Sequence, residues 1–147
     1  MPRPELSAKV LRRKLAPTIL ANIGIAVMQR AKQLCPKWLG KLRDSIHYKV
    51  IEDTVYIGTD LEYAYYMEYG RRPGKMPPIE NIRKWAKWHG MEGAEWAIAK
   101  KIAKEGIKVG TIEHPLETPS GWRPYLRPAV HQMKSEIPRI IRRTIMR

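Results

Sequence analysis

The spacing of apolar residues changes after residue 45, and this change limits the folds open to the chain. Residues 5–34 carry apolar residues at helical intervals, with Pro17 either starting a second helix or kinking one long helix. Pro36 then ends the helical segment. Residues 45–59 instead alternate apolar and polar side chains, which predicts a β-hairpin. The predicted helical stripe consists of Leu20, Ile23, Val27, Ala31 and Leu34.

Glycine and proline divide the rest of the chain. Residues 62–69 predict one or two helical turns that Gly70 closes, and residues 70–78 predict an exposed loop. A pair of helices is expected over about residues 78–105, with Gly106 as the final stop.

Residues 107–124 contain repeated glycine and proline, so they predict a strand or an extended arm. The chain then ends in a predicted helix that Pro138 bends near Lys134. The apolar stripe of this helix consists of Val130, Met133, Ile137, Ile140 or Ile141, and Ile145.

We therefore expect an α+β fold in one domain of residues 1–147, with a basic N-terminal segment 1–16. A long N-terminal helix and a C-terminal helix pack on a small antiparallel sheet, the hairpin of about residues 45–59. The helical pair of about residues 78–105 is an insertion into this framework.

The net charge and the aromatic composition both indicate a protein that binds a partner. The sequence has 28 Lys and Arg against 14 Asp and Glu, a formal net charge of +14, so nucleic acid or an acidic protein surface is expected as a partner. Its rings are seven Tyr and five Trp without Phe, which favours half-buried and interface positions. No apolar stretch approaches the roughly 18–20 residues of a membrane span, and the N-terminus lacks the apolar core of a signal peptide, so we expect no membrane contact.

Glu68 lies among tyrosines in the sequence and is the one acidic residue whose surroundings suggest a binding or catalytic role. It can accept hydroxyl hydrogen bonds, pair with Arg71 or Arg72, or act as a catalytic acid. A catalytic role needs a second carboxylate, a metal triad or a nucleophile–base pair, and the sequence near Glu68 contains none of these. Cys35 and the four histidines also lack zinc-site spacing. We expect no enzyme activity and no catalytic, cofactor or metal site.

Several exposed-looking residues are candidates for partner contact. The cations Arg71, Arg72 and Lys75 fit a solvated loop, a docking site for an acidic subunit, or a phosphate contact. Trp122 and Tyr125 lie in the extended stretch and suggest a subunit contact. The basic ends leave DNA and acidic protein open as partners, and their residues are Arg12, Arg13, Lys14, Arg139, Arg142, Arg143 and Arg147.

Ordered motifs resemble a family of long-tailed phage proteins, the tail-completion and head–tail joining (neck) proteins grouped around the tenth gene product of phage HK97. The resemblance covers roughly residues 25–147; the N-terminal segment and the helical insertion after Gly70 depart from it. The matching motifs are AKQLCP (31–36), GKLRDSI (40–46), YIG (56–58), YAYYMEYG (63–70), PIENIRKW (78–85), AIAKKI (97–102) and RPYLRPA (123–129).

The resemblance implies a non-enzymatic virion protein of the neck or tail top, made in the host cytoplasm during assembly. It implies a ring of roughly six copies between the head connector or stopper and the tail terminator or tail tube, with non-specific contact to passing DNA. The candidate interface residues are Tyr63, Tyr66, Glu68, Arg71, Arg72, Lys75, Trp122, Arg123, Tyr125 and Arg127.

A basic nucleic-acid-binding module is the alternative. The sequence shows no zinc-finger spacing, no RNP-like aromatic strand and no evident helix-turn-helix pair to support it. A small nuclease or toxin is a more remote interpretation, because it needs a general base together with a metal or nucleophile.

Overall fold

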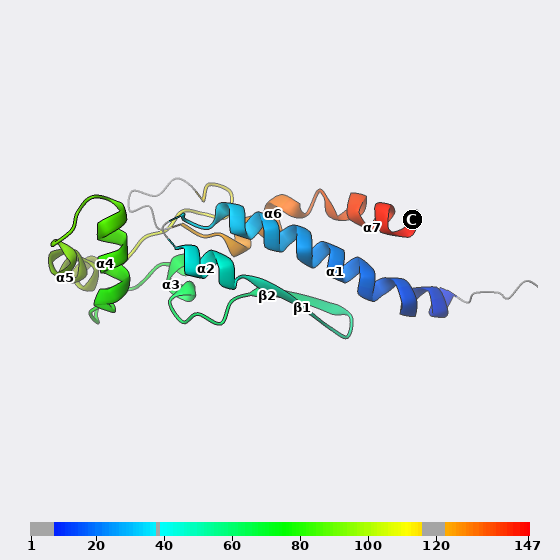
Figure 1. Cartoon of the computed structure of the whole chain (residues 1–147), viewed down its shortest axis with the longest axis horizontal. Coiled ribbons are helices and arrows are strands. Elements are labelled where there is room, and N and C mark those ends of the chain that lie inside the picture. The colour runs from blue at the N-terminus through cyan, green and yellow to red at the C-terminus, as the bar shows by residue number, and fades with distance from the viewer. Residues whose placement is uncertain (1–7, 38, 116–122) are drawn as a thin grey trace, which may run out of the picture.

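The computed structural model describes residues 8–37, 39–115 and 123–147. One long helix, α1, lies between a β-hairpin on one side and the C-terminal helices on the other (Figure 1), and two further helices form one end of the molecule. In chain order the elements are α1 (Ala8–Leu34), α2 (Gly40–Ser45), β1 (His47–Ile51), β2 (Thr54–Gly58), α3 (Ala64–Tyr69), α4 (Ile79–Trp88), α5 (Glu95–Glu105), α6 (Leu126–Met133) and α7 (Ile137–Ile145). The predicted α+β fold is confirmed.

Helix α1 is continuous through Pro17, so one long helix forms rather than two. Val27, Ala31 and Leu34, all from the predicted stripe, are buried. Gly24 faces the hairpin, where an added Cβ atom would lie 2.8 Å from side-chain atoms of both Tyr48 and Val55. A missing side chain at this position therefore lets the helix approach the sheet closely.

The hairpin pairs β1 with β2 in antiparallel register, with His47 opposite Gly58 and Ile51 opposite Thr54. Alternate residues are half-buried and exposed, as the period of two requires for a sheet covered on one face. Helix α1 covers the half-buried face. The hairpin prediction for residues 45–59 is confirmed.

Two glycines let the inserted helices join the main body. Arg71 and Ile107 form an isolated antiparallel bridge, with N–H···O distances of 3.0 and 2.8 Å. Gly70 and Gly106 precede these residues at φ values of 78° and 76°, and a Cβ atom on either would collide with the backbone oxygen of the other strand. The helical pair expected over residues 78–105 is present as α4 and α5, and Gly106 ends it.

The C-terminal segment differs from the prediction of one bent helix. It forms two helices, α6 and α7, and Pro138 sits in the first turn of α7, where its missing N–H is tolerated. Val130 is 41% exposed and Ile145 is 54% exposed, so the predicted stripe does not face the core throughout. Restarting the helix after Met133 changes which residues face α1.

The core lies where α1, α2, α3 and α6 meet, around Leu42, Ile46, Met67 and Ala129. Within residues 107–115, which begin the expected strand or arm, the bridge at Ile107 is the sole β-pairing described. No helix among the described residues is both long and apolar enough to cross a membrane.

Candidate partner interface

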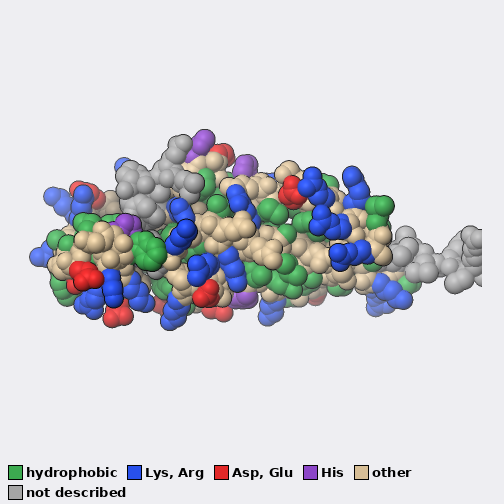
Figure 2. All heavy atoms as spheres, turned by 45° about the horizontal axis from the view of Figure 1, so that its top comes forward, with side chains coloured by type: hydrophobic (Ala, Val, Ile, Leu, Met, Phe, Trp, Pro, Cys, Tyr) green, Lys and Arg blue, Asp and Glu red, His purple; other side chains and the backbone are tan. Residues whose placement is uncertain are grey.

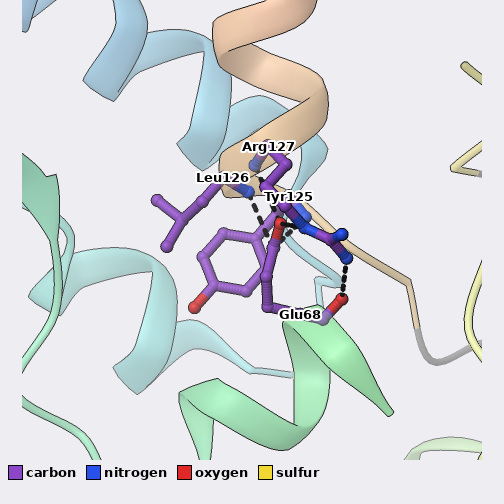
Figure 3. A network of polar contacts seen from close by, with 4 residues as sticks. All are labelled: Glu68, Tyr125, Leu126 and Arg127. Carbon is purple, nitrogen blue, oxygen red and sulfur yellow. Dashed lines mark hydrogen bonds and ion pairs between the residues drawn. The ribbon is translucent and has the colours of Figure 1, made fainter. Parts of the chain in front are cut away.

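Glu68 anchors the start of α6 from inside the protein. Glu68 is 2% exposed, and its Oε2 atom accepts the backbone N–H groups of Tyr125 at 2.8 Å and Leu126 at 2.9 Å. The Oε1 atom accepts the backbone N–H of Arg127 at 2.8 Å and its Nε–H at 3.1 Å (Figure 3). One carboxylate therefore satisfies three N–H groups at the start of a helix.

The chemistry of a helix terminus explains this arrangement. The first N–H groups of a helix have no partner within the helix, and the aligned peptide dipoles place partial positive charge there. The described side chain of Tyr125, the residue that precedes α6, does not cap the helix itself. The Glu68 carboxylate supplies the missing acceptors, and Arg127 closes the contact by donating from Nη2 to the backbone oxygen of Glu68 at 2.8 Å.

This contact corrects the predicted role of Glu68. Its ion-pair partner is Arg127 rather than Arg71 or Arg72, and no described tyrosine hydroxyl donates to it. Because it is buried, Glu68 faces no partner molecule and instead joins α3 to α6.

The arm residues next to Glu68 also make contacts within the chain. Tyr125 is 0% exposed, and burial raises the pKa of its hydroxyl above the usual value. Arg123 donates from Nε to the backbone oxygen of Leu34 at 2.9 Å, at the C-terminal end of α1. The proposed subunit contact by Tyr125 is therefore corrected to a core role, and Trp122 lies outside the described residues.

The outer side of α3 presents a cluster of tyrosines. Tyr65 is 63% exposed, Tyr69 53% and Tyr66 37%. The Tyr65 ring lies 4.8 Å from that of Tyr69 and 5.8 Å from that of Tyr66, measured between centroids. Tyr65 and Tyr69 were not among the predicted interface residues, although their spacing of four residues would place them together on a helix.

Arginines hold these rings and extend the cluster with positive charge. The guanidinium carbon of Arg71 lies 4.8 Å from the Tyr66 ring centroid, and that of Arg127 lies 4.3 Å from the Tyr69 centroid. Arg71 also donates to the backbone oxygens of Lys75 at 3.1 Å and Met76 at 3.3 Å, which orders the loop. We call this surface the tyrosine face, formed by Tyr65, Tyr66, Tyr69, Arg71, Arg72 and Lys75, which line one open groove.

A smaller and more enclosed cavity, of about 340 Å³, adjoins the tyrosine face between α3 and α4. Tyr63, Tyr66 and Met67 line it on one side, and Pro78 and Ile82 on the other. Burial raises the pKa of the Tyr63 hydroxyl, which lies at the edge of the core. The structure thus brings Tyr63, Tyr66, Arg71 and Lys75 of the predicted set around adjacent hollows.

The other predicted surfaces lie elsewhere on the molecule. Arg12, Arg13 and Lys14 are exposed on α1, and Arg139, Arg142 and Arg143 are exposed on α7. Trp85 packs against the core, whereas Trp88 is 60% exposed and Trp96 58% exposed on the α4–α5 pair. Solvent-facing tryptophans of this kind are typical of interaction surfaces.

Comparison with known proteins gives a family match over the first half of the fold. No curated protein and no solved structure matches the chain significantly. A family model does match residues 5–70, a span that includes α1, α2, the hairpin and α3 and ends at Gly70. The matched span begins and ends earlier in the chain than the motifs, which extend over roughly residues 25–147. The model is described as "Bacteriophage HK97-gp10, putative tail-component", and over residues 5–70 it confirms the resemblance of this chain to that family of phage tail components.

Proposed function

We propose that this protein is a structural subunit of the phage neck, where it joins the head connector to the tail during tail completion. Its partners are the connector or stopper on one side and the tail terminator or tail tube on the other. The tyrosine face is the surface that docks one of these neighbours. The family match to a phage tail component supports a structural role in the virion.

The observation that carries this proposal is the chemistry of the tyrosine face. Tyrosine and arginine dominate the energetic centres of protein interfaces, because they offer large contact area and hydrogen bonding at a low entropy cost. Here both kinds of side chain are held in place before binding, since two cation–ring contacts and the Arg71 loop contacts order them. The exposed cations Arg72 and Lys75 favour a neighbour with acidic residues at the contact.

A ring of roughly six copies is the proposed assembly. Such a ring would carry about +84 formal charges, given +14 for each copy, so the copies repel one another unless partners neutralise part of the charge. Acidic surfaces on the connector or tail proteins are therefore part of the proposal. Neutral or basic facing surfaces on those neighbours would contradict it.

Light scattering with and without tail particles tests the assembly. We expect the purified protein to form rings or to be retained on tails, with the rings visible in negative stain. A monomer that neither assembles nor binds tails would refute the proposed function.

Paired substitutions test the tyrosine face itself. The double variant Tyr65→Ser/Tyr69→Ser removes two exposed rings and should weaken retention on tails at least about thirtyfold, the effect of losing one strong interface residue. Tyr56→Ser is the matched control, because Tyr56 is 56% exposed on the hairpin and lies outside the tyrosine face. Equal loss in both variants would show that the tyrosine face is not the docking surface.

A further inference from the structure

We propose that the end of the molecule formed by the start of α1 and by α7 binds the phosphate backbone of duplex DNA. Two hydrogen bonds, one to α6 and one to α7, show that the C-terminal helices run in the opposite direction to α1. Asn22 donates from Nδ2 to Oγ1 of Thr144 at 2.9 Å, and Arg30 donates from Nε to Oε1 of Gln132 at 2.6 Å. This packing brings basic residues from the two ends of the sequence to one end of the fold (Figure 1). We call them the basic tip: Arg12, Arg13, Lys14, Arg139, Arg142, Arg143 and Arg147.

The basic tip has almost no compensating negative charge. Helices α1 and α7 contain no Asp or Glu within their described bounds. Within the described part of the chain, Arg139 is the single member of the tip in an ion pair, with Glu136 at 3.3 Å. Figure 2 shows several Lys and Arg side chains at this end of the molecule, with others spread over the rest of the same face. The tip therefore presents a concentrated positive potential to solvent.

A groove between the two helices adds neutral hydrogen-bonding groups to this charge. It has a volume of about 430 Å³. Thr18, Asn22 and Gln29 line it from α1, and Arg143 and Arg147 line it from the other side. Lys14 lies one helical turn before Thr18 on the same side of α1. Guanidinium groups beside hydroxyl and amide groups are the usual donors to phosphate oxygens.

The residue types at the basic tip favour DNA over a protein partner. All but one of its cations are arginine, which binds phosphate through two parallel hydrogen bonds. Neither α1 nor residues 126–147 contain a Phe, Tyr or Trp, so the tip lacks both the aromatic anchors of a protein interface and a platform for stacking single-stranded bases. Contact with duplex phosphates, independent of sequence, is the binding mode that this composition supports.

Fluorescence anisotropy with a labelled duplex of about 20 base pairs tests the proposal, at salt concentrations from about 50 to 200 mM. The tip variant Arg142→Gln/Arg143→Gln/Arg147→Gln should bind at least tenfold more weakly than the wild type at the lowest salt. The slope of log affinity against log salt should fall by about 2.7, at roughly 0.9 for each lost phosphate contact. Arg12→Gln/Arg13→Gln/Lys14→Gln should have a similar effect from the other helix.

The control variant Lys84→Gln/Lys87→Gln/Lys100→Gln removes the same charge from exposed positions on α4 and α5. We expect its DNA affinity to stay within about threefold of the wild type. Equal losses in the tip and control variants would show that net charge alone drives binding, and would overturn the proposal.

Two further probes test the other partner classes. Ile145 is 54% exposed and Met146 78% exposed beside the arginines, features that a membrane or protein surface could use. Polyglutamate and anionic phospholipid vesicles represent these two classes. Binding of either probe that depends on the tip, without DNA binding that depends on it, would refute the assignment to DNA. None of these measurements requires tails, so their failure is distinct from failure of the proposed neck function.

Discussion

Replacing Glu68 with glutamine is the sharpest test of how the fold holds the tyrosine face. Glutamine keeps the shape, but it offers one acceptor oxygen and turns an NH2 donor toward N–H groups that now contact a carboxylate oxygen at 2.8–3.1 Å. Loss of a helix cap costs about 1 kcal/mol, and breaking a buried ion pair costs about 3–5 kcal/mol. Arg127 is 36% exposed and regains some hydration, so we expect a total of about 3 kcal/mol.

Urea unfolding followed by circular dichroism measures this change, with the dependence on urea concentration unchanged. In thermal unfolding the same loss corresponds to a midpoint about 6–12 °C lower. Glu80→Gln is the matched control, because Glu80 is 77% exposed and contacts Arg83 at 3.6 Å, so it should change stability by less than about 0.5 kcal/mol. If Glu68→Gln is as mild as this control, the cap does not stabilise the fold and the reasoning fails.

Three further substitutions test separate features of the structure, and a fourth, Gly93→Ala, is the control for the first. Gly106→Ala should destabilise the fold by at least about 2 kcal/mol, because strain at its φ of 76° adds to a collision with the backbone oxygen of Arg71; Gly93→Ala, at φ 88° with no atom near its Cβ, should cost about 1 kcal/mol. Burial raises the pKa of the Cys35 thiol from 9.0 to about 12. As the pH rises, the thiol of the unfolded chain therefore loses its proton before that of the folded chain, which favours unfolding. Urea titrations should show that the stability of the wild type relative to Cys35→Ala falls between pH 9 and 12. Tyr125→Phe removes a buried hydroxyl that has no hydrogen-bond partner among the described residues, so urea unfolding should show equal or slightly higher stability.

The opposite results are equally specific. Similar losses at Gly106 and Gly93 would remove the evidence that close backbone approach joins α4 and α5 to the body. A pH-independent difference between wild type and Cys35→Ala would mean that the thiol is hydrated in the folded state. A loss above about 1 kcal/mol in Tyr125→Phe would reveal a hydrogen bond to the hydroxyl, for example through a buried water molecule.

Local patterns predicted the elements well because their causes are local. Alternation of apolar residues specified the hairpin, and positive φ values at Gly70 and Gly106 follow from turns that few other residues tolerate. The helices separate after Met133, close to the bend predicted near Lys134, but the capping of α6 by Glu68 was missed, because Glu68 lies more than fifty residues earlier in the chain. No periodicity in the sequence reports a contact at that separation.

The candidate site was predicted only in part, for the same reason. Arg71, Arg72 and Lys75 could be chosen from a loop rich in glycine and cations, and these residues do line an open groove. Glu68 and Tyr125 were chosen for their chemistry, but the structure uses that chemistry inside the protein. The two basic ends could be read from the sequence, whereas their meeting at one tip depends on the antiparallel packing of α1 against α6 and α7.

The positions of the tyrosine face and the basic tip determine what one subunit of the proposed ring can contact. The tyrosine face belongs to α3 and its loop, whereas the basic tip lies at the free ends of α1 and α7, well apart along the molecule (Figure 1). One subunit can therefore contact a protein and DNA at the same time. If the tips point toward the ring axis, their mutual repulsion opposes closure, so added duplex DNA or salt should promote assembly. If the tips point outward, assembly should respond weakly to both, so the salt dependence of ring formation reports the orientation of the subunit.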